Sequence, residues 1–522
     1  MLQKVLNSRI YLVFIIPFLL GLISVLSFQP FNFPLINFII FPIIFLLLTY
    51  INKKSKNKYR KKPYLKNLFF VGYFFGIGFF LSGTHWISYS LTFDETFKYF
   101  IPLSIILIPL FLAIFFGVAT ILIGPFLQNN FYSILLFCFS FASLDYVRSK
   151  ILTGFPWNLW AYSWSSFTEV LQILSIIGLF AFNILTITIF CIPLLLFFKN
   201  KKVNLSIFTF WVVLFLSNYI YGSIKVNKNY KEIKSSDKEE INIKIISPNF
   251  DLKYNLTNSD IRNLLSKLIR YSQPDKEKET LFVWPEGVFT GYNLSDISEF
   301  KSLIKNNFST KHKIMFGVNT YDHQRNKYFN SLILINNKFE IIYSYNKKKL
   351  VPFGEFLPIE SIIKKIGLKK ITHGYESFSK GKNQKNLILG NLNILPLICY
   401  EVIFTELIQK AENKTNLIVN ISEDAWFGDS IGPKQHFTKA IYRAIESGTF
   451  LVRSANKGYS AFINNRGEVL KSLKPNEAGN IEMNIPIVSN SFKNKNDLIF
   501  FILLFTYTLI FFTLKKISNE KK

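Results

Sequence analysis

Three residues with the chemistry of a nucleophile, a base and a cation occur in this chain, each beside an apolar stretch. Glu286 follows the run Phe-Val-Trp-Pro, Lys347 precedes the rigid, turn-forming stretch 350–358, and Cys399 closes the apolar stretch 393–398. A thiol, a carboxylate and an amine are sufficient for acyl transfer through a thioester. These spacings predict a nucleophilic cysteine that is served by one acid and one ammonium.

Read separately, each of the three stretches also fits a structural role. Glu286 alone fits a solvated acid at a strand end, and Cys399 alone fits a buried structural cysteine. Lys347 begins a run of three lysines, which is typical of a solvated edge, and the residues themselves do not separate it from Lys348 or Lys349. Taken together they favour a site, because carboxylates keep a nearby amine protonated and a carboxylate can accept the proton of a thiol. The ammonium would then stabilise an oxyanion.

The other two cysteines indicate no further chemistry. Cys138 and Cys191 lie inside apolar stretches, where cysteine behaves as a small buried hydrophobe. The chain has no CxxC pair and no Cys/His spacing typical of a metal site, and three cysteines argue against a disulfide framework. We therefore expect no metal and no cofactor, and Cys399 is left as a free thiol.

The composition predicts a membrane protein. Half of the residues are hydrophobic and 17% are aromatic, which exceeds the norm for a soluble protein. The net charge of +28 could suggest a nucleic-acid partner, but the basic residues stand in short runs beside apolar segments. That pattern favours topology control and contact with anionic headgroups. We expect the bilayer as a partner and no nucleic acid.

Eight apolar stretches are long enough to cross a bilayer, which needs about 20 apolar residues. They are Ile10–Phe28, Pro34–Ile51, Leu68–Leu91, Phe100–Ile123, Phe131–Val147, Val170–Phe198, Leu205–Ile224 and Leu498–Leu514. With eight spans, four basic segments fall on one side: the N-terminus, residues 52–67, residues 199–202 and the C-terminal tail. By the positive-inside rule that side is the cytoplasm. The polar segment that contains Cys399 is then expected outside it.

The chain divides by composition into three parts. We predict a membrane domain of seven spans over residues 1–224, an extracytoplasmic domain over 225–496, and a last span with a cytoplasmic tail over 497–522. Short apolar, β-branched strands alternate with helical patterns in the polar part, which indicates a layered α/β domain. The expected strands are 241–246, 280–284, 313–318, 331–336, 339–345, 392–399, 417–421, 450–455, 459–463 and 481–485, with helices at 260–271 and 435–448 and hairpin turns at 336–337 and 464–467.

Several motifs carry a family resemblance. The stretch Trp-Pro-Glu ending at Glu286, Lys347 with the following Leu-Val-Pro-Phe-Gly-Glu, and Cys399 with the following Tyr-Glu resemble the Glu-Lys-Cys motifs of the nitrilase superfamily. The stretches 424–429 (Asp-Ala-Trp-Phe-Gly-Asp) and 432–437 (Gly-Pro-Lys-Gln-His-Phe) are similar to one branch, the apolipoprotein N-acyltransferases. In the membrane part, residues 27–34, His85-Trp86 and 153–157 resemble the N-terminal region of the same family.

The resemblance implies an αββα sandwich for the polar domain and a ping-pong mechanism. It implies the following roles by residue-wise match: Glu286 as general base, Lys347 as oxyanion stabiliser, Cys399 as nucleophile, Glu355 as the glutamate that positions the lysine, and Tyr400 and Glu401 as required neighbours of the cysteine. It also selects Lys347 over the two lysines that follow it. Lys457 is a departure, because the family often has a smaller residue there.

Four aromatic residues are candidates for substrate binding. Tyr254 stands where the family usually has a tryptophan, Trp426 and Phe427 could cap a pocket or belong to a packed loop, and Trp157 could line a lipid portal or belong to an interface belt. His436 is interpreted as a satisfied helix residue and not as a base.

The resemblance implies N-acylation of the S-diacylglyceryl cysteine of an apolipoprotein, with a phospholipid as acyl donor, in the bacterial inner membrane and on its periplasmic side. One alternative is a membrane-anchored amidase of the nitrilase type that hydrolyses a small soluble amide. Another is a membrane sensor or transporter. A transporter should carry ionisable groups deep in its spans, and the centres of these spans hold few.

Overall fold

The computed structural model describes residues 8–58, 63–234, 239–253, 256–358, 377–382, 385–487 and 497–520. The chain forms two compact units. The first, here called the membrane unit, comprises Met1–Ser88, Tyr99–Asn227 and Lys495–Lys522; the second, the sheet unit, comprises Tyr89–Lys98 and Lys228–Asn494. The short segment Tyr89–Lys98 lies in sequence between two long apolar helices, yet it packs with the sheet unit.

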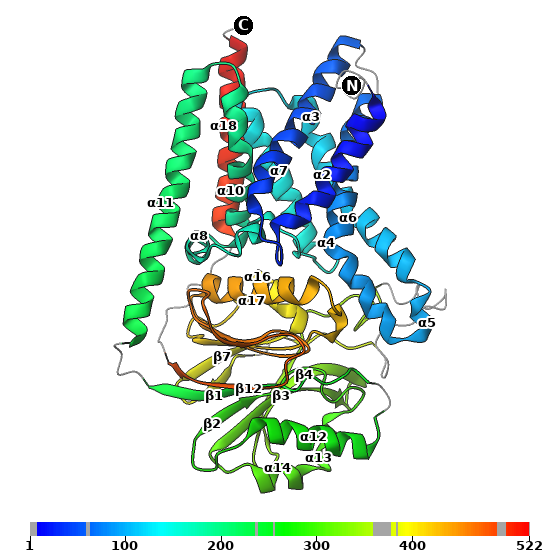
Figure 1. The fold of residues 1–522 in the computed structure, drawn as a ribbon, viewed down its shortest axis with the longest axis vertical. Helices are drawn as coiled ribbons and strands as arrows, with labels where there is room; N and C mark the ends of the chain where they lie inside the picture. Colours follow the sequence, from blue (N-terminus) through cyan, green and yellow to red (C-terminus); the bar gives the residue numbers. More distant parts are fainter. Residues whose placement is uncertain are drawn as a thin grey trace. The chain divides into compact units, whose positions relative to one another are not determined.

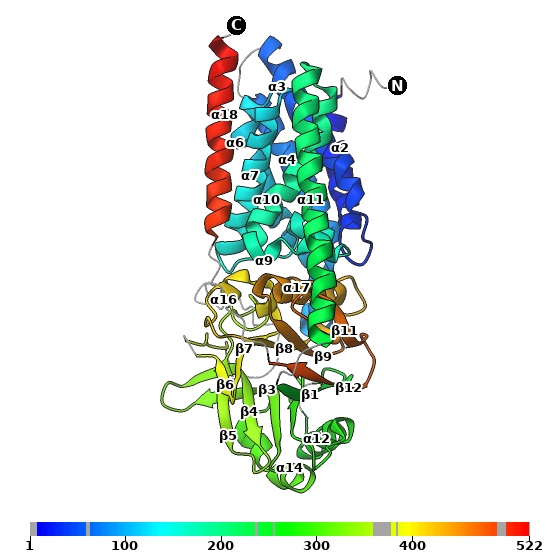
Figure 2. The same cartoon turned by 90° about the vertical axis from the view of Figure 1, so that its left-hand side faces the viewer.

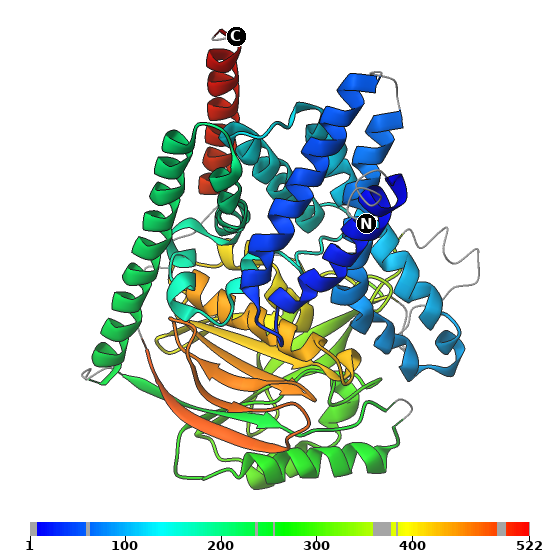
Figure 3. The ribbon, with the colours of Figure 1, turned by 45° about the horizontal axis from the view of Figure 1, so that its top comes forward.

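In the described part of the chain, seven helices of the membrane unit are long and apolar enough to cross a membrane. Their cores are α3 (Asn37–Lys58), α4 (Pro63–Thr84), α6 (Ile101–Ile123), α7 (Phe131–Lys150), α10 (Leu179–Cys191), α11 (Lys201–Lys234) and α18 (Leu498–Glu520). In a bilayer a helix satisfies every backbone N–H and C=O internally, so runs of this composition fold as helices there. Figures 1 and 3 show α11 standing apart from the other long helices of this unit, and few of its side chains are buried.

Seven of the eight predicted spans correspond to these helices. The first, Ile10–Phe28, forms a helical run over Tyr11–Ser27 whose centre is α2 (Ile16–Ser24). It is shorter than the others and lies at the lower limit of length for a span. The sixth, Val170–Phe198, was predicted too long. It is broken into α8 (Thr168–Leu171), α9 (Leu174–Ile177) and α10, and Gly178, whose φ is 77°, ends the helical path between α9 and α10.

Close approach between three of the helices explains why their sequences contain glycine. A Cβ on Gly21 of α2 would lie 2.1 Å from the backbone oxygen of Phe75 in α4, and one on Gly72 of α4 would lie 2.3 Å from that of Phe116 in α6. Small residues at such crossings let helices pack backbone to backbone. Figure 2 shows α18 at one edge of this unit, where Tyr507 shares a 2.9 Å hydrogen bond with Thr188.

In its described residues, the sheet unit contains two six-stranded sheets. The first has the order β12-β1-β2-β3-β4-β5 and the second the order β11-β10-β9-β8-β7-β6. The strands are β1 (Glu240–Ser247), β2 (Thr280–Val283), β3 (His312–Asp322), β4 (Lys327–Asn336), β5 (Ile341–Asn346), β6 (Leu387–Leu389), β7 (Leu392–Ile398), β8 (Leu417–Glu423), β9 (Phe450–Asn456), β10 (Ser460–Ile463), β11 (Val469–Leu473) and β12 (Gly479–Pro486). Strands β1, β2 and β3 are parallel, as are β7, β8 and β9, so the carboxyl ends of each set share one edge.

Helices cover both outer faces of the paired sheets, as Figure 1 shows. The helices beside the first sheet are α12 (Asn258–Ser272), α13 (Leu294–Ser298) and α14 (Lys301–Asn307), and those beside the second are α16 (Thr405–Gln409) and α17 (Gly432–Ser447). Helix α12 begins with a capping box in which Thr257 and Asp260 satisfy each other's backbone N–H groups. Its apolar face joins a buried core that includes Leu265, Phe282 and Trp284. The predicted αββα sandwich is confirmed.

All ten predicted strands and both predicted helices of this unit are present, and so are both hairpin turns. Asn336 Oδ1 accepts the backbone N–H of Lys338 at the first turn, and Gly467, with φ 83°, donates its N–H to the Asn464 carbonyl at the second. The strands β6 and β11 and the helices α13, α14 and α16 were not predicted.

Candidate functional site

Cys399 stands at the sharp turn between β7 and a short 3₁₀ helix, Cys399–Ile403. Its φ is 48°, in the left-handed region that a residue with a Cβ rarely adopts. Such a conformation costs about 1–3 kcal/mol and persists only where the surroundings hold it. The side chain is buried, with 8% of its surface exposed. The predicted strand-to-turn position of the thiol is therefore present.

The carboxylate of Glu401 ties this turn to the segment that carries Lys347. It accepts backbone N–H groups from Ile398 at 2.8 Å, from Lys348 at 2.6 Å and from Lys349 at 3.1 Å. It also accepts the hydroxyl of Tyr345 at 3.0 Å. Glu401 is fully buried, and a buried carboxylate is tolerated only with several donors. Glu401 thus fixes the residue before Cys399 against the end of β5.

Lys347 is buried between two carboxylates, Glu286 and Glu355. Its Nζ lies 2.8 Å from Glu355 Oε1 and 3.3 Å from Glu286 Oε1. Asn330, on β4, donates its Nδ2 to the same two oxygens at 2.7 Å for Glu286 and 2.8 Å for Glu355. The remaining oxygen of Glu286 accepts the N–H of Glu423 at 3.1 Å. The structure thus brings Glu286, Lys347 and the predicted accessory Glu355 into one buried cluster, and the thiol of Cys399 interacts electrostatically with Glu286 and Lys347.

Local turns explain how Glu286 and Glu355 reach this cluster. Glu286 follows β2 and precedes Gly287, whose φ is 74° and where a Cβ would lie 2.7 Å from Glu423 Oε2. Glu355 closes a turn in which its own N–H donates to the Val351 carbonyl at 2.9 Å and its Oε2 accepts the Val351 N–H at 2.8 Å. The Pro-Phe-Gly turn signal in the sequence therefore serves to present Glu355 to Lys347.

The charges around the site keep the lysine protonated and the thiol neutral. Burial lowers the pKa of Lys347, but the carboxylates of Glu286 and Glu355 outweigh it, so that pKa is raised above its usual range. Burial, followed by the charge of Glu286, raises the pKa of Cys399, and the ammonium of Lys347 offsets only part of this rise. In the resting site Cys399 is thus a neutral thiol, and it loses its proton when the sulfur attacks a substrate.

We expect alkylation of Cys399 by a small neutral haloacetamide to accelerate steadily between about pH 6 and pH 9, because the thiolate is the reactive form and the pKa of this thiol is raised. The rate is measured by mass spectrometry of the peptide that contains Cys399, with Cys399→Ala as the blank. A plateau already reached below about pH 7 would indicate a preformed thiolate and contradict this expectation.

Both parts of this chain are similar in sequence to known proteins. A family profile for the apolipoprotein N-acyltransferase N-terminal domain matches residues 20–192, and one for carbon-nitrogen hydrolases matches residues 251–489. The apolipoprotein N-acyltransferase of Rickettsia prowazekii is 32% identical over 482 residues, which cover 90% of this chain and 92% of that protein. The one from Rickettsia typhi is 31% identical over 513 residues, with 95% and 98% covered.

This chain belongs to the apolipoprotein N-acyltransferase family. The resemblance stated from the motifs is thereby confirmed, and the protein is a multi-pass membrane protein. Among solved structures, a CN-hydrolase superfamily protein from Xanthomonas campestris aligns with 14% identity and a TM-score of 0.35, covering 47% of this chain and 91% of that one.

In this member of the family, two of the predicted substrate-binding aromatics lie in a packed loop of the sheet unit. Trp426 contacts Phe93 edge to face at 5.1 Å, and Phe427 packs on the ring of His436 at 5.1 Å. Tyr400 is buried and contacts Phe404 at 5.1 Å. Phe93 comes from the segment 89–98, so the Trp426 loop packs against residues that are distant in sequence. The binding roles of Trp426 and Phe427 stay predictions.

The other two predicted substrate-binding aromatics, Trp157 and Tyr254, do not belong to this loop. Trp157 belongs to the membrane unit, where its ring has no exposed surface and packs beside Trp86 at 4.5 Å and Phe155 at 6.1 Å. A ring buried in this way does not belong to an exposed interface belt, and its place in a lipid portal stays a prediction. Tyr254 lies outside the described residues. Lys457, the predicted departure, pairs with Asp251 at 2.7 Å.

Sequence reasoning gave no site role to Glu423, Asp424 and Arg453, which adjoin the site, although Asp424 begins one of the motifs that carry the family resemblance. Glu423 donates its backbone N–H to Glu286 and accepts Asn456 Nδ2 at 2.9 Å; burial raises the pKa of its carboxyl well above the usual range. Asp424 accepts Arg453 Nη2 at 2.8 Å. The Asp-Ala-Trp-Phe motif, which follows the expected strand 417–421, was the signal in the sequence that could have found these residues. Strand β8 lies parallel to β7 and next to it, so the residues after β8 lie beside Cys399, which follows β7.

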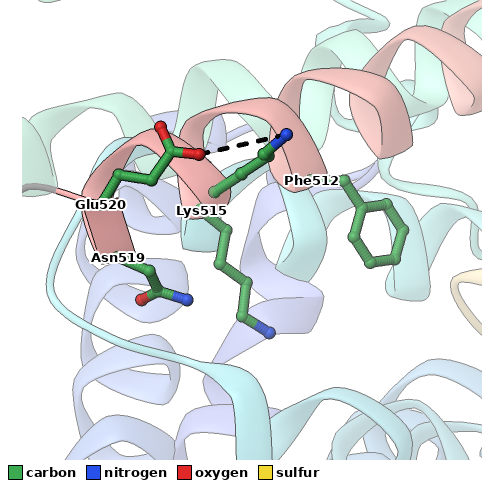
Figure 4. Close-up of a pocket in the computed structure, with 5 residues that line it drawn as sticks. Phe512, Lys515, Asn519 and Glu520 are labelled. Carbon is green, nitrogen blue, oxygen red and sulfur yellow. Dashed lines mark ion pairs between the residues drawn. The ribbon is translucent and has the colours of Figure 1, made fainter.

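A pocket at the end of α18 is separate from this cluster. Phe512, Lys515, Lys516, Asn519 and Glu520 line it. Lys516 Nζ lies 4.0 Å from Glu520 Oε1, and a dashed line at Glu520 marks this ion pair in Figure 4. It contains none of the candidate catalytic residues. Within the described ranges, no three His, Cys, Asp or Glu side chains gather as metal ligands would.

Proposed function

We propose that this protein transfers a fatty acyl group from a phospholipid to the N-terminal amine of an S-diacylglyceryl cysteine in an apolipoprotein. The observation that carries the proposal is the buried cluster of Cys399, Glu286 and Lys347 in a chain whose relatives are named apolipoprotein N-acyltransferases. The cluster supplies a nucleophile, a base and a cation within one water-poor site.

The first half-reaction forms a thioester on Cys399. Glu286 accepts the thiol proton while the sulfur attacks the ester carbonyl of the phospholipid, and the negative charge that develops on the carbonyl oxygen lies beside the Lys347 ammonium and backbone N–H groups near Cys399. The intermediate collapses as the carbon–oxygen bond breaks. The proton held by Glu286 passes to the departing oxygen, lysophospholipid leaves, and a thioacyl-enzyme remains.

The second half-reaction forms the amide. The α-amine of the diacylglyceryl cysteine attacks the thioester carbonyl, and Glu286 accepts the proton that the amine loses. The carbon–sulfur bond then breaks, the proton returns from Glu286 to the sulfur, and the thiol is regenerated. The same carboxylate thus serves both steps, and the burial of the site protects the thioester from hydrolysis.

The expected location is the bacterial inner membrane, with the sheet unit on the periplasmic side. It is supported by the distribution of basic residues, which lie in the loops and ends that eight spans put on one side. Both substrates are anchored in a membrane leaflet, so an enzyme held in the same bilayer meets them by diffusion in two dimensions.

The proposal is tested by the intact mass of the full-length protein after incubation with phospholipid in micelles. We expect an added mass of one fatty acyl chain on the parent and on the matched control Cys138→Ala, whose cysteine is buried in α7, and no addition on Cys399→Ala. A synthetic diacylglyceryl-cysteine peptide should then remove the adduct and become acylated. A parent that never acquires the adduct but hydrolyses small amides would establish the amidase alternative instead.

A further inference from the structure

Helix α17 places a buried histidine behind the nucleophile. The Nε2 atom of His436 lies 3.2 Å from the backbone carbonyl oxygen of Cys399. On the other side of the ring, Nδ1 lies 3.0 Å from Asp424 Oδ1 and 3.0 Å from Arg453 Nη2. His436 and Arg453 have no exposed surface and Asp424 has 1%, so these contacts are made in the interior of the protein.

The partners of the ring decide where its proton lies. A carbonyl oxygen can only accept, so Nε2 must carry the hydrogen that bonds Cys399. At Nδ1 the ring meets one group of each kind, because the Asp424 carboxylate can only accept and the Arg453 guanidinium can only donate. Nη2 of Arg453 also binds both oxygens of Asp424, at 3.0 and 2.8 Å, so these two side chains hold each other beside the ring. Burial and the charge of Arg453 lower the pKa of His436, which favours a neutral ring whose hydrogen is on Nε2.

A planar peptide transmits this contact to the next residue. In a trans peptide the C=O and the N–H point in opposite directions. Holding the Cys399 carbonyl toward His436 therefore directs the N–H of Tyr400 away from it. The turn needs such a hold, because Cys399 has a φ of 48°. Glu401 secures the residue before the cysteine through the Ile398 N–H, and His436 secures the peptide after it.

We propose that His436 is a positioning residue whose Nε2–H fixes the Cys399–Tyr400 peptide, so that the Tyr400 N–H is aimed at the carbonyl oxygen that becomes negative during thioacylation, with Arg453 and Asp424 holding the ring in place. This inference rests on the thioacyl chemistry proposed above. It assigns His436 no contact with substrate and no proton transfer.

The rates of two reactions of the Cys399 sulfur, thioacylation and alkylation, distinguish a positioning role of His436 from a general loss of structure. Thioacylation by phospholipid needs the oxyanion donors, whereas alkylation by a neutral haloacetamide needs only an accessible thiolate. For His436→Leu we expect thioacylation to fall by about 10²-fold, the loss typical of one oxyanion donor, while alkylation of Cys399 changes by less than about threefold. The matched control is Ile445→Val, a core change near the far end of the same helix, which should leave both rates within about threefold.

A second pair of variants tests the reach of the donor. The amide nitrogen of Gln extends to the position of Nε2 and that of Asn only to the position of Nδ1, so His436→Gln should recover thioacylation to within about tenfold of the parent and His436→Asn should not. This pair also decides the matter if His436→Leu does not fold. Equal losses of both rates, or equal thioacylation by the Gln and Asn variants, would overturn the proposal. A parent without a thioacyl adduct would instead overturn the proposed function.

Discussion

Replacing Glu286 by glutamine should reduce thioacylation of Cys399 by about 10⁴-fold, the upper range for loss of a general base. Glutamine keeps the shape of the side chain but accepts no proton from the sulfur. Its oxygen can still receive Asn330 and Lys347, which both donate to Oε1 in the parent. Its amide nitrogen then faces the backbone N–H of Glu423, a donor against a donor, which should lower the free energy of unfolding by about 1–3 kcal/mol.

The measurement is the single-turnover rate of acyl transfer to Cys399, followed by intact mass, beside the thermal unfolding midpoint of the same preparation. Glu299→Gln is the matched control, since that glutamate is exposed at the end of α13 and its loss should change the rate by less than about threefold. A Glu286→Gln variant that still acylates within about tenfold of the parent would assign the proton to another group.

Much of the fold was predictable because it follows from local pattern. Strands such as β7 and β8 are entirely buried, so their sequences are mostly apolar and rich in Ile and Leu. Strand β11 was missed because four of its five residues are exposed and it lacks such a run. Strand β6 has three residues and helix α16 has five. Both are too short to show the alternation typical of a strand or the 3.6-residue repeat typical of a helix.

The chemical site was predictable in its residue types and incompletely in its geometry. Cys399, Glu286 and Lys347 stand at strand ends, and their types alone indicate acyl transfer. The choice of Lys347 over Lys348 needed the family resemblance, because the sequence of three consecutive lysines does not show which of their side chains faces the carboxylates. In the structure Lys348 contributes its backbone N–H to Glu401, while only Lys347 lies between the two carboxylates.

The role of His436 could not be predicted, because it depends on a backbone feature that has no sequence pattern. His436 was interpreted as a satisfied helix residue, and it is satisfied, but its partner is the carbonyl of Cys399. That contact indicates a positioning role because Cys399 has a left-handed backbone conformation, which needs support from its surroundings. Likewise, nothing in the composition of residues 89–98 predicts that Phe93 packs on Trp426, since long-range contacts are not encoded in local periodicity.

Replacing Lys347 by methionine should both inactivate and destabilise the protein. The change removes the ammonium between Glu286 and Glu355 and leaves two buried carboxylates with Asn330 as their shared donor. Removing one partner of a buried pair costs about 3–5 kcal/mol of the free energy of unfolding. Loss of the oxyanion cation should lower thioacylation by about 10³-fold. Alkylation of Cys399 should also slow at a given pH, because the ammonium lowers the pKa of that thiol.

A double variant separates the two effects of this lysine. Lys347→Met combined with Glu355→Gln removes one of the unpaired charges, so the unfolding midpoint should recover while thioacylation stays as low as in the single variant. Lys348→Met is the control from the same run of lysines, and it should keep thioacylation within about tenfold because its side chain packs over Tyr345 and not in the carboxylate cluster. If the double variant regained activity together with stability, Lys347 would serve only to neutralise buried charge, and the oxyanion would depend on backbone donors alone.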